Sequence, residues 1–159
     1  MRKTAIFITV LCFAAPDLAL SAPWELDPVH TGVHFKVRHL MVSSVRGVFE
    51  KVSGTVTYDE SDITRSTADI TIDAASINTR DAKRDGDLRN PDFLHVAKYP
   101  SITFKSKKVE KAGDGRLKMT GDLTIKGVTK EVDLLIEGPT PPAKDPWGNT
   151  RVGGSATTR

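Results

Sequence analysis

Residues 117–126 read LKMTGDLTIK, and every second side chain is apolar or small while those between them are polar. A period of two is typical of a β-strand with one buried and one solvated face. The dipeptide Lys126-Gly127 follows, and Val132, Leu134 and Ile136 repeat the period in the next segment. Two such runs joined by a short glycine turn predict an antiparallel hairpin.

The same alternation recurs on both sides of this hairpin. The upstream runs, each with its apolar residues on one parity, are Val33, Phe35, Val37 and His39; Val48, Val52, Val56 and Tyr58; Ala68, Ile70, Ile72 and Ala74; and Ile102, Phe104 and Ser106. A weakly apolar seventh run begins at Arg151. Gly47 and Gly54 accompany the second run, where glycine is typical of a bend or bulge that curls a sheet. The sequence therefore predicts an all-β fold of meandering antiparallel strands.

Residues 78–97 depart from this pattern. Their composition is helical and charged, and Pro91 interrupts them, which favours one or two short helices over one long helix. We expect these helices to cover one end of the sheet with their apolar side chains, which are Leu88, Phe93, Leu94 and Val96.

An amphipathic meander with one apolar face folds either as a two-sheet sandwich or as a closed barrel. Several positions of the inward parity are small, namely Gly54, Ala68, Ala74, Gly121, Gly154 and Ala156. Small inward side chains leave volume unfilled, and an eight-stranded barrel with spare volume can hold one small ligand. The pattern therefore favours a barrel with an internal cavity over a filled sandwich.

Composition and charge narrow the function classes. The 159 residues suffice for one domain, and 38% apolar with 27% charged residues is typical of a globular protein rather than a disordered or collagen-like one. The formal net charge of +3 does not favour nucleic acid as a partner, and the basic cluster at residues 105–108 lacks interleaved aromatic residues. We expect this cluster to be a solvated strand edge.

Residues 1–21 predict a signal peptide. A basic start precedes an apolar stretch over residues 5–15, which is too short to span a bilayer, and small residues allow cleavage before Ala22. The alternative is a buried N-terminal helix. Because the single cysteine, Cys12, lies in this stretch, the mature protein would contain no disulfide. We expect export to the bacterial periplasm of one domain comprising residues 22–159.

Motifs for catalysis and metal binding are weak or absent. His30, His34 and His39 lie close in sequence, but no carboxylate has a compelling spacing to them, and polar or packing roles are the simpler interpretation. The stretch Asp85-Gly86-Asp87 lacks the ligand positions of a calcium loop and is interpreted as a charged turn. No nucleophile elbow, zinc-binding helix or phosphate-binding glycine loop occurs. We therefore predict no catalytic residue, no metal and no cofactor.

Several motifs together resemble one known family. They are DPVHT at residues 27–31, FKVRHLMVS at 35–43, VRGVF at 45–49, SGTV at 53–56, FLHVAKYP at 93–100, ITF at 102–104 and GDLTIKGVTK at 121–130. Their order and spacing are similar to those of the YceI-like family of secreted bacterial proteins, from about Trp24 to Thr158.

This resemblance implies an antiparallel, lipocalin-like barrel whose apolar tunnel holds a polyisoprenoid, an isoprenoid quinone or a similar long-chain lipid. It implies a periplasmic binding or carrier protein rather than an enzyme. It also implies further strand sequence beyond residues 153–158, so we expect that C-terminal strands are missing and that the barrel is open.

We expect the ligand to contact inward-facing side chains, with ordinary core packing as the alternative for each. The candidates are Phe35, Val37, His39, Val48, Val56, Ile72, Phe104, Met119, Leu123 and Leu134, with Phe93 and Leu94 as a lid over one mouth. The expected partners are an isoprenoid lipid or quinone, a second copy of the chain in a homodimer, and a membrane surface met during lipid exchange, but no nucleic acid.

Two other functions remain open. The first is a hydrolase or isomerase that acts on a lipid-like substrate with His39 as base, which requires a carboxylate or hydroxyl within reach. The second is a filled sandwich that acts through protein contacts, as a stress-related or envelope interaction module.

Overall fold

The computed structural model describes residues 23–59 and 61–158, and the predicted signal peptide, residues 1–21, lies outside this part of the chain. The strands are β1 (Pro23–Glu25), β2 (Val33–His39), β3 (Ser43–Phe49), β4 (Val52–Thr57), β5 (Thr67–Asp73), β6 (Ile77–Asn78), β7 (Ser101–Gly113), β8 (Arg116–Ile125), β9 (Val128–Glu137), β10 (Ala143–Lys144), β11 (Thr150–Arg151) and β12 (Ser155–Thr157). Helix α1 spans Ala82–Arg89, and short 3-10 turns at Ile63–Arg65 and Ala74–Ser76 flank β5. Among the described residues, no helix has both the length and the apolar character needed to cross a bilayer.

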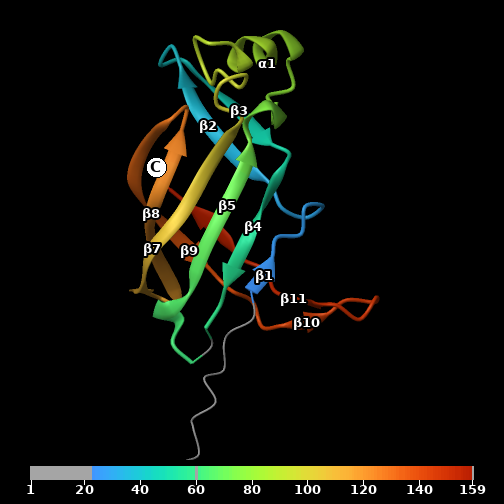
Figure 1. Ribbon diagram of the computed structural model, residues 1–159, viewed down its shortest axis with the longest axis vertical. Coiled ribbons are helices and arrows are strands. Elements are labelled where there is room, and N and C mark those ends of the chain that lie inside the picture. Colours follow the sequence, from blue (N-terminus) through green and yellow to red (C-terminus); the bar gives the residue numbers. More distant parts are fainter. Residues whose placement is uncertain (1–22, 60, 159) are drawn as a thin grey trace, which may run out of the picture.

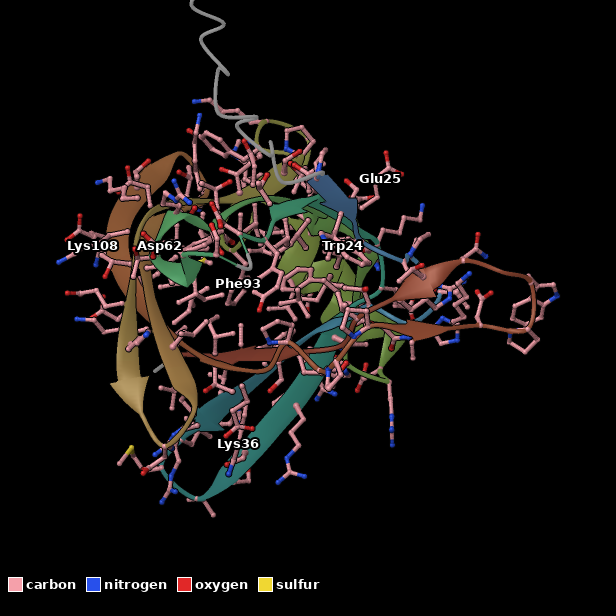
Figure 2. All side chains as sticks on the ribbon, turned by 90° about the horizontal axis from the view of Figure 1, so that it is seen from below. Trp24, Glu25, Lys36, Asp62, Phe93 and Lys108 are labelled. Carbon is pink, nitrogen blue, oxygen red and sulfur yellow. The ribbon has the colours of Figure 1, made fainter. Side chains whose placement is uncertain are left out.

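Seven strands form one antiparallel sheet in the order β1-β4-β5-β7-β8-β9-β12. The sheet curls into a half-barrel, and the view along its length shows the strands arranged round a central region (Figures 1 and 2). Strands β2, β3 and β6 form a three-stranded sheet, β10 and β11 a separate hairpin, and α1 lies at one end of the half-barrel (Figure 1). The predicted class, an antiparallel all-β barrel with a short helix over one end, is confirmed.

Apolar side chains pack inside this curled sheet in two clusters. The buried residues of the first are Phe49, Val52, Ile72, Ala74, Ile77 and Ile102. Those of the second are Ala68, Phe104, Val109 and Met119. Ile70 and Leu123 contact both clusters. The two clusters therefore join into one apolar surface along the inside of the sheet, called the inner face below.

A bulge in β7 explains how one strand supplies both parities to the core. The register between β7 and β8 shifts between Ser106 and Lys108. Ile102 and Phe104 are buried before the shift, and Val109, which has the opposite parity, is buried after it. Because side chains alternate with a period of two, one extra residue turns the rest of the strand over.

Gly121 permits the close approach of β8 to β7. A Cβ atom at this position would lie 2.5 Å from the carbonyl oxygen of Lys105 and 2.6 Å from Cζ of Phe104. The small inward residue predicted here therefore makes room for a neighbouring aromatic ring instead of leaving volume unfilled.

The run from Val48 to Tyr58, predicted as a single strand, is two strands in different sheets. The chain leaves β3 after Phe49 and enters β4 at Val52. Both of these residues are buried although their parities differ, because the chain changes sheet between them. The weak run from Arg151 is likewise divided, between β11 and β12.

The stretch Asp85-Gly86-Asp87, predicted as a charged turn, lies within α1. Asp85 is 7% exposed. Its carboxylate accepts hydrogen bonds from the backbone N–H of Thr79 at 2.9 Å and from the Thr79 hydroxyl at 2.6 Å. This aspartate joins α1 to the end of β6, which is a role that composition does not reveal.

The basic cluster at residues 105–108 was predicted to lie at a strand edge. It lies instead on β7, in the middle of the seven-stranded sheet. Strand β7 pairs with β5 on one side and β8 on the other. Lys107 Nζ lies 2.6 Å from Asp122 Oδ1 and 3.1 Å from Glu131 Oε2, and these two hydrogen bonds raise the pKa of the lysine. The lysine charge is therefore paired across three strands.

Candidate functional site

The inner face carries apolar side chains that are only partly covered. Around the buried floor lie half-buried residues from several strands, namely Val56, Leu117, Leu123, Val132, Leu134 and Ile136. Among the described residues the edge strands β1 and β12 are not hydrogen-bonded to each other, so the seven-stranded sheet is open along one side. An apolar surface whose side chains are only partly covered can receive an apolar molecule.

Most of the predicted ligand-contacting residues come together on this surface. Ile72, Phe104 and Met119 are 6%, 5% and 8% exposed and form part of its floor. Five others are half-buried and pack on the same clusters: Phe35, Val56, Leu94, Leu123 and Leu134. The floor residues support the surface, and the half-buried ones have area left for a ligand.

Val48 does not face inward, contrary to the prediction. In the β2–β3 pairing, His34 is opposite Val48 and Phe35 is opposite Gly47. Directly paired residues share a face of the ribbon, so Val48 and Phe35 lie on opposite faces. Phe35 packs on the first cluster, which leaves Val48 on the outer face. The error arose because the parity of β4 was extended into β3, across the change of sheet.

Val37, His39 and Phe93 are exposed. Val37 and His39 have the parity of Phe35, but both are open to solvent, Val37 with an exposed fraction of 55%. Phe93 is 54% exposed and lies near the centre of the ring of strands in the lengthwise view (Figure 2). This position agrees with the expected place of a lid, which stays a prediction.

Sequence reasoning missed several residues that build the surface. Phe49 and Val109 are buried at 8% and 2% exposure, and neither has the parity assigned to its run. Both lie beside an interruption of strand pairing: Phe49 is the last residue of β3 before the chain changes sheet, and Val109 follows the bulge in β7. An apolar residue beside such an interruption was the only signal that could have found them.

Two hollows among the described residues are lined in part by Ile77 and Val52 of the first cluster, but by none of Phe104, Met119 and Leu134. One is lined by residues that include Glu50, Arg80, Asp81, Asp85 and Arg89, and the other by residues that include Pro28, Lys51, Asp73 and Pro100. Charged side chains occur in both, which does not suit a long apolar chain. The inner face is therefore the better candidate site.

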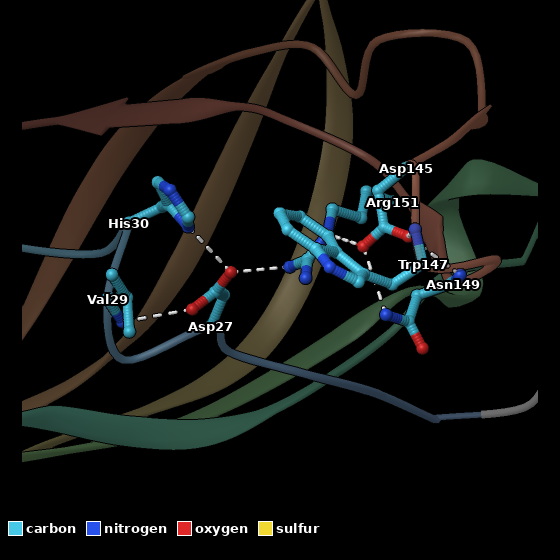
Figure 3. Close-up of polar contacts among 7 residues, drawn as sticks. All are labelled: Asp27, Val29, His30, Asp145, Trp147, Asn149 and Arg151. Carbon is cyan, nitrogen blue, oxygen red and sulfur yellow. Dashed lines mark hydrogen bonds and ion pairs between the residues drawn. The ribbon is translucent and has the colours of Figure 1, made fainter.

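A charged network outside the inner face ties the N-terminal segment to the β10–β11 hairpin (Figure 3). Arg151 bridges the carboxylates of Asp27 and Asp145, and its Nε lies 2.7 Å from Asp145 Oδ2. His30 Nδ1 lies 2.7 Å from Asp27 Oδ2, and Asn149 Nδ2 donates to Asp145 at 3.0 Å. We call these five residues the clasp.

Hydrogen bonding lowers the pKa of both clasp carboxyls. The bond with His30, followed by that from the backbone N–H of Val29, lowers the pKa of Asp27 to about 2. The bonds from Asn149 and Arg151 lower the pKa of Asp145 to about 2. Both aspartates are thus held ionised at neutral pH, which suits structural ion pairs better than proton transfer.

The geometry around His39 gives little support to the hydrolase or isomerase hypothesis. Within the described residues, the imidazole of His39 makes no side-chain hydrogen bond or ion pair, and the histidine paired with a carboxylate is His30, whose side chain is 77% exposed. The same residues contain no group of three or more histidine, cysteine, aspartate or glutamate side chains placed to hold a metal ion.

These features define a class: a curled antiparallel β-sheet of the barrel type with an apolar inner face. The sequence profile of the YceI-like domain matches residues 24–158, and the chain belongs to the YceI-like family. It is 40% identical over 161 residues to the protein YceI of Escherichia coli O157:H7, covering 96% of this chain and 81% of that protein. It is 38% identical over 162 residues to a UPF0312 protein of Vibrio vulnificus strain YJ016, covering 100% and 85%.

Solved structures agree with this assignment. The YceI protein of Campylobacter jejuni is 40% identical, with a TM-score of 0.65 and coverage of 82% of this chain and 76% of that one. BcnA of Burkholderia cenocepacia is 27% identical, with a TM-score of 0.62 and coverage of 72% and 68%.

Proposed function

We propose that this protein is a periplasmic carrier that holds a polyisoprenoid, an isoprenoid quinone or a similar long-chain lipid against the inner face of its half-barrel. The observation that carries the proposal is the set of half-buried apolar side chains beside a buried apolar floor. Leu123 and Leu134 belong to this set. The protein acts by binding rather than by catalysis and needs no cofactor.

The driving force is the transfer of apolar surface out of water. At about 0.8 kcal/mol for each buried CH₂, about twenty buried carbons contribute on the order of 16 kcal/mol before other terms. Ordering a flexible chain offsets much of that free energy. The remainder still gives useful affinity without a charged partner in the site, which agrees with the apolar inner face.

A carrier of this kind must be exported and must meet a membrane to load and unload. Export rests on the predicted signal peptide at residues 1–21, and cell fractionation with N-terminal sequencing tests it. A mature chain that begins at Ala22 in the periplasmic fraction supports export, and an uncleaved chain in the cytoplasm contradicts it.

We expect near one bound lipid per chain, or one per homodimer. Sedimentation velocity distinguishes a monomer from a homodimer.

The direct test is native mass spectrometry of freshly purified protein, followed by organic extraction and lipid identification. A co-purifying isoprenoid or long-chain lipid at the expected ratio supports the carrier. A mass without lipid, unchanged after incubation with isoprenoid lipids, contradicts it and favours a protein-interaction module.

Strand β9 offers a matched pair of variants. Leu134 is opposite Met119 and shares the inner face, whereas the adjacent Leu135 is opposite Lys118 and lies on the other face. Both leucines are half-buried. We expect Leu134→Arg to reduce the lipid-bound fraction about tenfold or more, because a charge beside an apolar chain is costly, and Leu135→Arg to leave it unchanged. If Leu134→Arg does not fold, Leu134→Trp blocks the same surface with an apolar side chain.

A further inference from the structure

The turn between β2 and β3 exposes three consecutive apolar side chains. Leu40 is 78% exposed, Met41 77% and Val42 88%. Single exposed apolar residues are common on protein surfaces, but a contiguous group of them marks an interaction site. We call Leu40, Met41 and Val42 the apolar tip.

The backbone of the apolar tip has a conformation that is unfavourable for the residue types it contains. The N–H of Val42 donates to the carbonyl of His39 at 3.1 Å, which closes a four-residue turn. Its central residues, Leu40 and Met41, have φ angles of 50° and 60°. Such hairpin turns favour Asn-Gly, because large side chains rarely adopt positive φ. Folding stability and solubility would both favour polar residues here, so the apolar tip points to a binding role.

Cationic residues lie on the two strands that lead to the apolar tip. Residues 28–49 contain no aspartate or glutamate, while Lys36, Arg38 and Arg46 all lie on β2 and β3 and are exposed. Lys36 is directly opposite Arg46 in the strand pairing. Within residues 23–59 and 61–158 the ion pairs are made by other cations, so these three have no acidic partner there. A surface that fits these residues has an anionic outer layer, to face the three cations, and an apolar layer under it, to receive the apolar tip.

Other exposed apolar groups lie at the same end of the molecule. Figure 1 shows the β2–β3 turn, α1 and the β8–β9 turn at one end of the half-barrel. Phe93, after α1, is 54% exposed, and Val128, at the start of β9, is 59% exposed. Lys126, in the β8–β9 turn, donates to the carbonyl of Pro91 at 2.7 Å, which joins these two segments. These exposed apolar groups therefore lie at the same end of the long axis as the apolar tip.

We propose that the apolar tip inserts into the interface of an anionic phospholipid membrane, with Lys36, Arg38 and Arg46 placed against the phosphate headgroups. Apolar insertion combined with basic residues is the general chemistry of peripheral membrane attachment. A second copy of this chain fits less well, because two tips facing each other would bring six unpaired cations together. The inference deepens the proposed function by naming the surface that meets the membrane, and its measurement does not depend on a bound lipid.

Flotation with lipid vesicles tests the proposal directly. The purified protein should float with vesicles made of equal parts phosphatidylglycerol and phosphatidylcholine, and far less with phosphatidylcholine alone. Added salt should weaken the binding, because the attraction to the headgroups is electrostatic. Failure to float with either vesicle overturns the proposal.

Three variants identify the surface. Replacing the apolar tip by serine, L40S/M41S/V42S, should lower vesicle binding about tenfold or more. The pair K36Q/R46Q should lower binding to the anionic vesicles by about twenty-five-fold, at about fivefold for each charge. Val29→Ser is the matched control, since Val29 is 82% exposed in a different turn, and it should bind like the unchanged protein. Circular dichroism verifies that each variant is folded.

The outcomes separate this inference from the carrier function. Vesicle binding that survives L40S/M41S/V42S overturns the inference, as does a change from dimer to monomer in that variant, which would identify the apolar tip as a contact between copies. Leu134→Arg should still float while it loses its cargo. Protein that binds vesicles but never carries lipid would contradict the carrier function alone.

Discussion

The β8–β9 and β2–β3 hairpins have similar local design and opposite surroundings. In the first, the turn residues Lys126 and Gly127 have φ angles of 50° and 74°. The ring of Tyr99 packs against Gly127, so that a Cβ atom added there would lie 2.7 Å from Tyr99 Cε1. In the second, Leu40 and Met41 have nearly the same φ angles and lie in solvent. Turn geometry is thus a local property, whereas the packing of a hairpin depends on what the rest of the chain places against it.

The difference extends along the strands. Met119 and Leu134 are paired across β8 and β9 and belong to the second core cluster. Val37 and Val45 are paired across β2 and β3, and Val37 is 55% exposed. Apolar alternation is therefore a sign of one buried face in the first hairpin, whereas in the distal half of the second hairpin Val37 stays largely in solvent.

The largest expected effect comes from the strands themselves. Met119→Ala should lower the free energy of unfolding by about 2–5 kcal/mol, because it opens a cavity in the core. Val37→Ala should change it by about 0.5 kcal/mol or less, because the side chain is mostly exposed. Urea denaturation of both variants measures the contrast. A cost for Val37→Ala as large as that for Met119→Ala would mean that the end of β2 is packed in solution.

A smaller effect is expected in the two turns, with opposite signs. Gly127→Ala should lower the free energy of unfolding by about 1–2 kcal/mol, because its φ is positive and the new Cβ would lie 2.7 Å from Tyr99 Cε1. Met41→Gly should raise it by up to about 1 kcal/mol, because glycine relieves the strain of a positive φ. Thermal or urea unfolding checks both signs. Destabilisation by Met41→Gly would refute the strain assigned to the apolar tip.

The smallest effect concerns the β10–β11 hairpin, which is held by the clasp. The pKa of Asp145 is lowered from 3.8 to about 2, so its stabilising effect is present above pH 3.8 and is lost as the pH falls through about 2. The backbone N–H groups of Trp147 and Asn149 both donate to Asp145 Oδ1 at 2.9 Å. Their NMR amide shifts should therefore titrate near pH 2, and Asp145→Asn should abolish that titration. A midpoint near the ordinary value of 3.8 would contradict the clasp.

Sequence pattern predicted the fold class well where strands run without interruption. The parities assigned to the runs that became β5, β8 and β9 place Ile72, Met119 and Leu134 on the inner face, as observed. The predictions that were wrong lie next to interruptions. Val48 was placed inward across a change of sheet, and the basic cluster at residues 105–108 was placed at an edge although β7 is a central strand.

By itself, the sequence determined that this chain forms amphipathic antiparallel strands of the YceI-like family, because a period of two and the turn residues are local properties of a chain. Only the tertiary structure decided which parities meet on the inner face, how the clasp joins Asp27 to Arg151, and that the apolar tip stays in solvent. Bulges, changes of sheet and contacts between distant residues set those features, since each depends on the free energy of packing the whole chain rather than on neighbours in sequence.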